Sequence, residues 1–346
     1  ISMKALQLVK YGSAQDSFLT VDIPTPSFTE KEDVLIRVHS FGLNFADVMA
    51  RKGLYKSSPP LPAVLGYEVV GEVIKVNNIK NKNLIGKRVL CLTRFGGYAE
   101  FVKSKDSSVK IIPENLSDGQ ALSMATQYCT AFLALNKCTD LKVSDTILIH
   151  SASGGVGTAL TQLAKNKGLK VIGLTRSAHK VEYLTNIGVD VPIITSERDY
   201  FSQIKLNPEL KKIKAIFNSV GGKTIKRDMG LLDVSGQLVF FGISDRSKYR
   251  RGFFFTIYQL LKIGKFHPVK LLLNSQTISG LNLLAIADKN PEQLNLAIEE
   301  LISLFNVGKL VPFEGNEFKW DEVSKAHSGL EKGNFTGKVY IKVITK

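Results

Sequence analysis

Residues 146–159 read TILIHSASGGVGTA, in which an apolar strand passes through a glycine-rich turn directly into a helix. The strand part is short, unbroken and apolar, as is typical of a parallel strand that is covered on both faces. Gly154 would let the backbone come close to a pyrophosphate, and Gly157 would let the helix pack closely on the strand. Because the first N–H groups of the helix would face that anion, the stretch predicts a dinucleotide-binding turn.

The residues that follow complete a βαβ unit. Apolar side chains recur at helical spacing over 159–164, and Gly168 ends the helix. The run Lys170–Thr175 then indicates a second parallel strand. A glycine turn with a purely structural role in a doubly wound sheet is the alternative to dinucleotide binding.

The end of this second strand indicates which dinucleotide is preferred. About twenty residues after the turn, an enzyme that uses NAD places an Asp or Glu for the ribose hydroxyls. This chain has Thr175, Arg176 and Ser177 there, followed by Lys180. A carboxylate would repel a 2′-phosphate, whereas a guanidinium, a hydroxyl and an ammonium suit one. NADPH is therefore predicted over NADH, and the alternative is that Arg176 and Lys180 are solvated charges at the start of a helix.

The N-terminal part of the chain has a different pattern. Short β-rich runs occupy 4–9, 33–40, 68–76, 87–92 and 98–102, with glycines in the expected turns at 42, 53, 66, 86, 96 and 97. This spacing favours a compact, partly open barrel.

From residue 120 onward, the rhythm changes to alternating helices and strands. A helix is predicted over 121–135, followed by strands at 215–218, 237–241 and near 279–284. A second helix is predicted over Pro291–Asn306, and a last strand over 338–344 is expected to return to the barrel. We therefore predict an α/β protein in which residues 127–285 form a doubly wound nucleotide-binding domain. That domain is inserted into a catalytic domain made of 1–126 and 286–346.

Length, apolar runs and cysteines indicate the kind of protein and its expected compartment. The chain has 346 residues, enough for two cores around one cleft. No signal peptide is expected, and the longest apolar run, 253–261, is too short to cross a bilayer. Three cysteines, Cys91, Cys129 and Cys138, lie among apolar neighbours and fit buried thiols in a reducing cytosol. A cytoplasmic protein is expected.

The formal net charge of +15 raises the question of nucleic-acid or membrane binding. One segment, 246–270, combines arginines and lysines with Phe253-Phe254-Phe255 and could lie on an anionic membrane surface. A solvated edge beside an apolar face is the favoured interpretation. We expect no nucleic-acid partner, and peripheral membrane contact is a secondary hypothesis.

Metal and hydrolase chemistry find no support. There is no Cys-x-x-Cys pair, and the five histidines are scattered without metal-ligand spacing, at 39, 150, 179, 267 and 327. Ser153 lacks the glycine frame of a nucleophile elbow. No metal site is predicted.

Several motifs resemble a known family. They are GLNFADVMARKGLY at 42–55, PPLP at 59–62, GYE at 66–68, GGYAE at 96–100 and TGKV at 336–339. Together with the turn at 151–157 they resemble the medium-chain dehydrogenase/reductase superfamily, most of all its quinone oxidoreductase branch. The run 44–62 is similar to the subgroup named for vesicle amine transport protein, whose animal members are linked to membranes. The resemblance implies a GroES-like barrel and a Rossmann sheet.

The resemblance also implies a reaction without zinc. Zinc alcohol dehydrogenases of this superfamily carry Cys at the position of Asn44 and His at that of Tyr67. Asn and Tyr cannot replace a thiolate and an imidazole as zinc ligands. Quinones and α,β-unsaturated carbonyls then fit better than simple ketones, because their π systems spread the charge that arrives with a hydride.

The family assigns roles to individual residues. Asn44 would orient the nicotinamide ribose or the substrate carbonyl, Tyr55 would donate a proton or a hydrogen bond, and Tyr67 would line the substrate pocket. A packing role for Tyr55 is equally compatible with its position. The remaining cofactor contacts carried over are Thr130 at the carboxamide, Gly155 and Val156 at the pyrophosphate, Arg176, Ser177 and Lys180 at the 2′-phosphate, and Val220, Gly242 and Lys338 around the cofactor. Gly154 and Gly157 of the turn and Thr175 at the strand end complete the predicted cofactor site.

Two departures from the family pattern bear on these expectations. Many quinone reductases carry Tyr where this chain has Met49 and Thr195, which weakens the assignment of quinone as acceptor and of NADPH as cofactor, respectively. The family further implies a homodimer that pairs an edge strand near 278–284. An enoyl-thioester reductase, or a membrane-associated protein with residual cofactor binding, remain as alternatives.

Overall fold

The computed structural model describes residues 2–244, 261 and 268–343, and the chain divides into two compact units. One unit comprises Ile1–Cys129 and Ile286–Lys346, and the other comprises Thr130–Ala285. Most of the basic segment 246–270 lies outside the described residues, so its expected surface role is not addressed by the structure.

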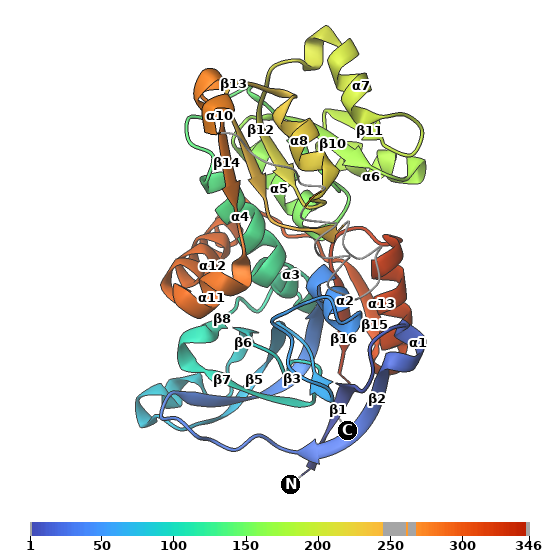
Figure 1. Cartoon of the computed structure of the whole chain (residues 1–346). Helices are drawn as coiled ribbons and strands as arrows, with labels where there is room; N and C mark the ends of the chain where they lie inside the picture. Colours follow the sequence, from blue (N-terminus) through green and yellow to red (C-terminus); the bar gives the residue numbers. More distant parts are fainter. Residues whose placement is uncertain (1, 245–260, 262–267, 344–346) are drawn as a thin grey trace. The chain divides into compact units, whose positions relative to one another are not determined.

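The second unit is built on a six-stranded parallel sheet (Figure 1). Its strand order is β11-β10-β9-β12-β13-β14. The sheet starts with β9 in the middle and winds outward in both directions, which is the order of a dinucleotide-binding sheet. The strands are β9 (Thr146–Ile149), β10 (Lys170–Thr175), β11 (Val191–Ile194), β12 (Ile213–Asn218), β13 (Leu232–Phe240) and β14 (Thr277–Gly280).

Helices cover this sheet and bury its apolar residues. α5 packs on β9 and β10, and α8 packs on β12 and β13 (Figure 1). Leu148, Ile172 and Ile216 belong to the buried core of the unit. The helices are α4 (Cys129–Asn136), α5 (Gly155–Asn166), η4 (Ala178–Lys180), α6 (Val181–Asn186), α7 (Tyr200–Leu206), η5 (Pro208–Leu210), α8 (Lys223–Met229), α10 (Pro268–Asn274) and α11 (Leu283–Lys289).

One expectation for this unit needs correction, and one strand was not expected. The strand expected near 279–284 is β14, which ends at Gly280, and Leu283 already begins α11. β11 was not expected, because its four residues include Pro192 and lack an alternating pattern. Pro192 pairs only toward β10, on the edge of the sheet, where a missing N–H does little harm.

The first unit contains two sheets. A seven-stranded sheet runs in the order β15-β16-β3-β5-β6-β8, with β7 also paired to β3, and a three-stranded sheet has the order β2-β1-β4. The buried core of this unit lies among Ile36, Phe41 and Val69. The strands are β1 (Ser2–Leu8), β2 (Phe18–Pro24), β3 (Asp33–Leu43), β4 (Ala63–Val64), β5 (Glu68–Val76), β6 (Arg88–Leu92), β7 (Phe101–Lys105), β8 (Val109–Ile111), β15 (Asn316–Lys319) and β16 (Val339–Lys342).

Two expectations differ for the first unit. The strand expected at 98–102 is β7, which begins at Phe101, because the backbone of Tyr98 pairs instead with Leu65 and Leu6. Gly42 was expected in a turn but lies inside β3, opposite Tyr340 of β16.

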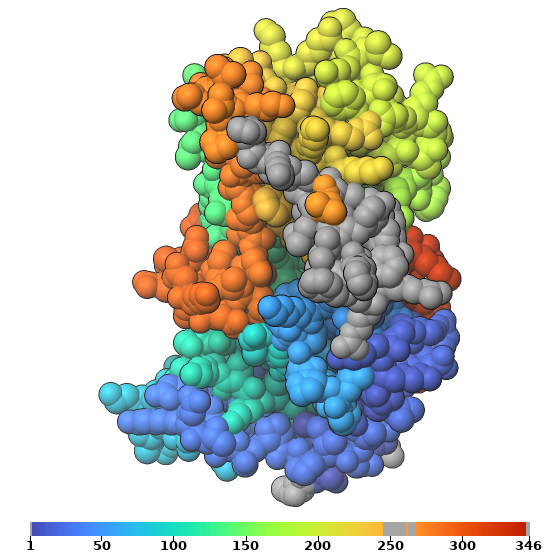
Figure 2. Space-filling model, viewed as in Figure 1, coloured from blue at the N-terminus to red at the C-terminus, as the bar shows by residue number. Residues whose placement is uncertain are grey.

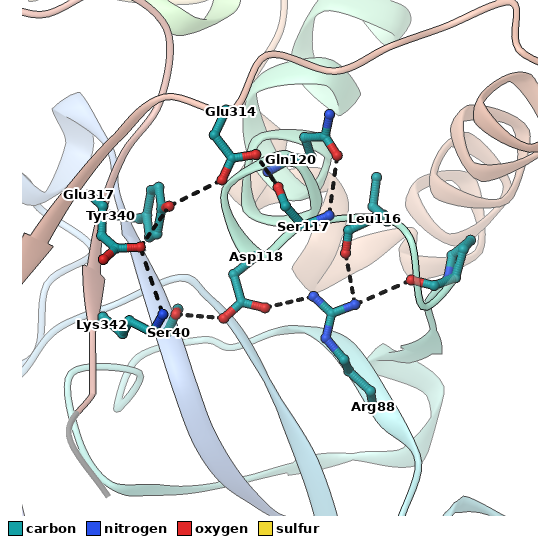
Figure 3. Close-up of polar contacts among 11 residues, drawn as sticks. Ser40, Arg88, Leu116, Ser117, Asp118, Gln120, Glu314, Glu317, Tyr340 and Lys342 are labelled. Atoms are coloured by element: carbon teal, nitrogen blue, oxygen red, sulfur yellow. Dashed lines mark hydrogen bonds and ion pairs between the residues drawn. The ribbon is translucent and has the colours of Figure 1, made fainter.

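Helices complete the first unit, and one of them is tied to the sheet by a polar network (Figure 3). Arg88 on β6 donates to Asp118 at 2.6 Å, and Asp118 accepts from Ser40 on β3 at 2.7 Å. Asp118 begins α3, so this network fixes α3 against the sheet. The helices are α1 (Ala14–Ser17), α2 (Phe45–Arg51), η1 (Ile79–Leu84), η2 (Asp106–Ser108), α3 (Asp118–Ser123), the π-helical η3 (Met124–Tyr128), α12 (Pro291–Asn306), η7 (Trp320–Glu322) and α13 (Val323–Lys332).

Candidate active site

The glycine turn lies between β9 and α5, as the sequence predicts. Gly154 is the N-cap residue of α5 and its N–H bonds to Ser151 O at 2.9 Å. A Cβ on Gly157 would overlap Ser151 O and lie 2.6 Å from Ala152 Cα, so only glycine fits there. Gly154, Gly155 and Val156 are partly exposed, which leaves the start of the helix accessible to an anion.

Two cationic side chains lie beyond the end of β10. Arg176 is exposed, whereas Lys180 is buried, with 6% of its surface exposed. Burial, followed by the charge of Arg176, lowers the pKa of Lys180. Two cations that disfavour each other gain from an anion placed between them, and a 2′-phosphate is such an anion.

The two threonines in this region have structural partners. Thr175 is buried, and its Oγ1 accepts a hydrogen bond from Ser177 N at 3.3 Å. Thr195 bonds to Thr175 O through its backbone N–H at 2.8 Å and its Oγ1 at 3.2 Å. Thr195 therefore holds the ends of β10 and β11 together.

A buried polar cluster supports the loop after β12. Asn218 Oδ1 accepts from the N–H groups of Val220 and Gly221, both at 2.8 Å. Asn218 Nδ2 donates to Asp228, which also accepts from Tyr200 Oη at 2.9 Å. This support was not predicted from the sequence, because its members come from separate elements.

Val220 and Gly242, which are both predicted cofactor contacts, follow β12 and β13, and the segments that contain them lie side by side. Phe241 N bonds to Asn218 O at 3.0 Å, and a Cβ on Gly242 would lie 2.5 Å from Ser219 O. His150, which precedes the glycine turn, lies with Nε2 2.9 Å from Asp228 Oδ2. The same cluster thus underlies the loops after β9 and β12.

Thr130, the predicted carboxamide contact, lies half-buried in the first turn of α4.

In the first unit, Asn44 lies in a buried polar cluster with Glu68 and Lys338. Asn44 Nδ2 donates to Glu68 Oε1 at 2.9 Å, and Asn44 Oδ1 accepts from Lys338 Nζ at 3.0 Å and from Thr126 Oγ1 at 2.8 Å. Lys338 and Glu68 form an ion pair, and both side chains are fully buried. These contacts fix the orientation of the Asn44 amide.

The ion pair between Glu68 and Lys338 lies against β3 at Gly42. Lys338 directly precedes β16, and Glu68 begins β5, on the two sides of β3. A Cβ on Gly42 would overlap Glu68 Oε1 and lie 2.7 Å from Lys338 Cε. The absence of a side chain at Gly42 therefore makes the room that the pair occupies.

A second buried carboxyl lies next to this cluster. Asp47 Oδ2 accepts from Asn44 N at 2.8 Å, and Asp47 Oδ1 has no hydrogen-bond partner among the described residues. Burial, reinforced by the charge of Glu68 and opposed by the hydrogen bond from Asn44, raises the pKa of Asp47 from 3.8 to about 7.

We expect Asp47 to make the folded protein less stable as the pH rises. A pKa raised from 3.8 to about 7 means that the native state holds this proton more tightly, so stability falls between about pH 4 and pH 7. From pH 5 to pH 8 the loss should be about 2–3 kcal/mol. Urea unfolding of wild type and Asp47→Asn at both values measures it. Equal pH dependence in the two proteins would contradict the assignment.

Two tyrosines predicted as site residues lie together. The rings of Tyr55 and Tyr67 meet edge to face with centroids 6.3 Å apart. Tyr67 is buried to 7% exposure, and its hydroxyl has no hydrogen-bond partner among the described residues. Burial raises the pKa of both hydroxyls, so they stay protonated at neutral pH and can donate a hydrogen bond.

Neither a metal cluster nor a membrane span is seen in the part of the chain that the structure describes. Over residues 2–244, 261 and 268–343, His, Cys, Asp and Glu form no group of three or more that could hold an ion. Over the same residues, every helix is too short or too polar to cross a bilayer. The three cysteines are buried, and burial raises the pKa of Cys91 and Cys138 to about 12.

Comparison with known proteins identifies two matching family models. The alcohol dehydrogenase GroES-like domain matches residues 30–130, and the zinc-binding dehydrogenase model matches residues 155–298. Together these matches cover most of both units.

Similar proteins match along almost the whole chain. The synaptic vesicle membrane protein VAT-1 homolog of Danio rerio is 29% identical over 98% of this chain and 69% of its own length. The human quinone oxidoreductase is 27% identical over 98% of this chain and 97% of its own. The crystal structure of Escherichia coli quinone oxidoreductase complexed with NADPH has a TM-score of 0.83 and 26% identity, and the match covers 98% of this chain and 100% of that one.

Proposed function

Because this chain belongs to the medium-chain dehydrogenase/reductase superfamily, in its quinone oxidoreductase branch, we propose that it reduces quinones or α,β-unsaturated carbonyls with NADPH and without zinc. It is an NADPH-dependent oxidoreductase; the acceptor class and the absence of zinc are the proposal. The observation that supports it is the buried Tyr67 hydroxyl, which has no hydrogen-bond partner among the described residues. By the family resemblance, Tyr67 occupies the position at which the zinc enzymes carry a histidine ligand.

The chain's own residues suit such a reaction. NADPH, when bound, supplies a hydride, and the acceptor takes up this hydride and one proton. Hydride arrival leaves negative charge on the acceptor oxygen, and a preorganised hydroxyl such as that of Tyr67 stabilises the charge by a hydrogen bond. Asn44, held by Glu68 and Lys338, gives this side of the site a fixed amide.

The tyrosine pair provides the test of the acceptor chemistry. We expect Tyr67→Phe to lower kcat/KM for a quinone by about tenfold to a hundredfold, because a donor to the developing oxyanion is lost. Tyr55→Phe is the matched variant, since it removes a hydroxyl from the neighbouring ring. Steady-state NADPH oxidation after treatment with a chelator measures both variants. The proposal would be wrong if both variants kept the wild-type kcat/KM, or if the chelator abolished turnover.

The cation pair beyond β10 predicts the cofactor preference. We expect Arg176→Ala to weaken NADPH binding about tenfold and to leave NADH binding unchanged, because only NADPH carries the phosphate. The pKa of Lys180 is lowered, so the NADPH preference should decline at alkaline pH as this ammonium loses its proton. Fluorescence titrations with both cofactors measure this, and equal wild-type affinities would contradict it.

The edge of the second unit's sheet supports a homodimer as part of the proposal. β14 is the edge strand, and α10, which precedes it, lies at the surface of its unit (Figure 2). Val269, Leu272 and Leu273 of α10 are largely exposed, at 55%, 76% and 76%. A second copy would cover both the strand edge and these side chains. Sedimentation equilibrium tests this, and a monomer at micromolar concentration would contradict it.

A further inference from the structure

The first unit carries a row of aromatic rings that ends on a cation. Tyr55 lies edge-on to Tyr67, and Tyr67 is followed by Phe95 with ring centroids 5.3 Å apart. The guanidinium carbon of Arg94 lies 5.1 Å from the centroid of the Phe95 ring. Tyr55 and Phe95 are partly exposed, whereas Tyr67 is buried and its hydroxyl has no hydrogen-bond partner within the described part of the chain. A ligand bound along this row would contact aromatic rings, a hydrogen-bond donor and a positive charge.

Arg94 can exchange its present partner for a ligand. Its Nε lies 2.9 Å from Asp288 Oδ1, with side chains 49% and 38% exposed, respectively. An ion pair this exposed is weak, so an incoming anion can replace Asp288 at little cost. The planar guanidinium presents parallel donors that match a carboxylate or a sulfonate.

The charge of Arg94 also reaches both tyrosines. It lowers the pKa of Tyr55 and of Tyr67 against the larger upward shift that burial causes. An acceptor whose oxygen meets Tyr67 would therefore lie within the electrostatic range of Arg94.

We infer that this row binds planar aromatic quinones that carry an acidic substituent, and that Arg94 is the residue that selects the substituent. The inference rests on the proposed function for the site at Tyr67. A flat conjugated ring gains contact with the aromatic rings, which an aliphatic enone lacks. The acidic group gains a charge-assisted hydrogen bond from Arg94.

A matched pair of ligands tests the inference. Calorimetric titration of the protein, without NADPH, compares 1,4-naphthoquinone with 1,4-naphthoquinone-2-sulfonate. Arg94→Gln should weaken binding of the sulfonate about tenfold and change binding of the neutral quinone less than about twofold. Asp288→Asn should strengthen binding of the sulfonate, because it removes the competing carboxylate. Both effects should shrink at high salt.

The outcomes separate this inference from the proposed function. Equal losses for both ligands in Arg94→Gln, an unchanged affinity for the sulfonate, or no wild-type binding of the sulfonate would overturn the inference. NADPH oxidation with the same two quinones is measured in parallel. Binding of the sulfonate that depends on Arg94, without oxidation of NADPH by either quinone, would overturn the reductase proposal and leave the selection by Arg94 intact.

Discussion

Lys338→Met is expected to lower the free energy of unfolding by about 3–5 kcal/mol, because it leaves the buried carboxylate of Glu68 without its cation. Met has a similar length and fills the space of the lysine stem, so the loss reports on charge rather than on a cavity. Asn44 Nδ2 would be the hydrogen-bond donor left to Glu68 Oε1 among those described.

Two further variants isolate this effect. The double variant Glu68→Gln with Lys338→Met removes both charges and should recover most of the loss. Lys325→Met removes a lysine of the first unit whose ion pair with Glu322 is exposed, so it should change stability by less than about 1 kcal/mol. Urea unfolding of the four proteins at pH 7 measures these differences. A Lys338→Met protein as stable as the Lys325→Met protein would contradict the assignment.

The ion pair between Glu68 and Lys338 could not be predicted from the sequence. Glu68 and Lys338 lie 270 positions apart, and no local pattern links them. Gly42 gave a misleading signal, because a glycine near the end of a strand resembles a turn residue. Its actual role is to leave room for two side chains, one from the first residue of β5 and one from the residue that precedes β16. Only the sheet order, which sequence periodicity does not encode, brings the three residues together.

The second unit was more predictable because its signals are local. The strand, the glycine turn and the helix of residues 146–166 follow one another in the chain, so a single stretch of sequence contains the whole motif. The cluster beneath the loop after β12 was not predictable in this way. Asn218, Asp228 and Tyr200 come from a strand and two helices, and their hydrogen bonds depend on how these pack.

The strands of the first unit that the sequence did not predict are either very short or mostly exposed. β4 and β8 have two and three residues, too few to establish an alternating pattern. β2 alternates at its end, but only Phe18 among its residues is buried, and it pairs with β1 alone. β15 is likewise an edge strand with one buried residue. Their pairing partners, rather than their own apolar content, make them strands.

Gly157→Ala is expected to abolish the nucleotide turn as a binding site. The added Cβ would overlap Ser151 O and lie 2.6 Å from Ala152 Cα, both backbone atoms, so α5 would have to move away from β9. We expect a loss of about 3 kcal/mol in stability, at the upper end for a residue that is too large for its site. NADPH affinity should fall at least about a hundredfold, because the N–H groups of α5 would no longer point at the pyrophosphate.

Gly154→Ala is the matched variant within the same turn. Its Cβ would meet only Ser151 O, at 3.3 Å, and its φ of −81° suits alanine, so stability should change by less than about 1 kcal/mol. NADPH affinity should still fall, because a methyl group would stand where the backbone approaches the phosphates. Urea unfolding and NADPH titration of both variants separate the two roles of glycine. If Gly154→Ala kept wild-type affinity while Gly157→Ala lost only stability, the turn would be a packing device rather than a binding site.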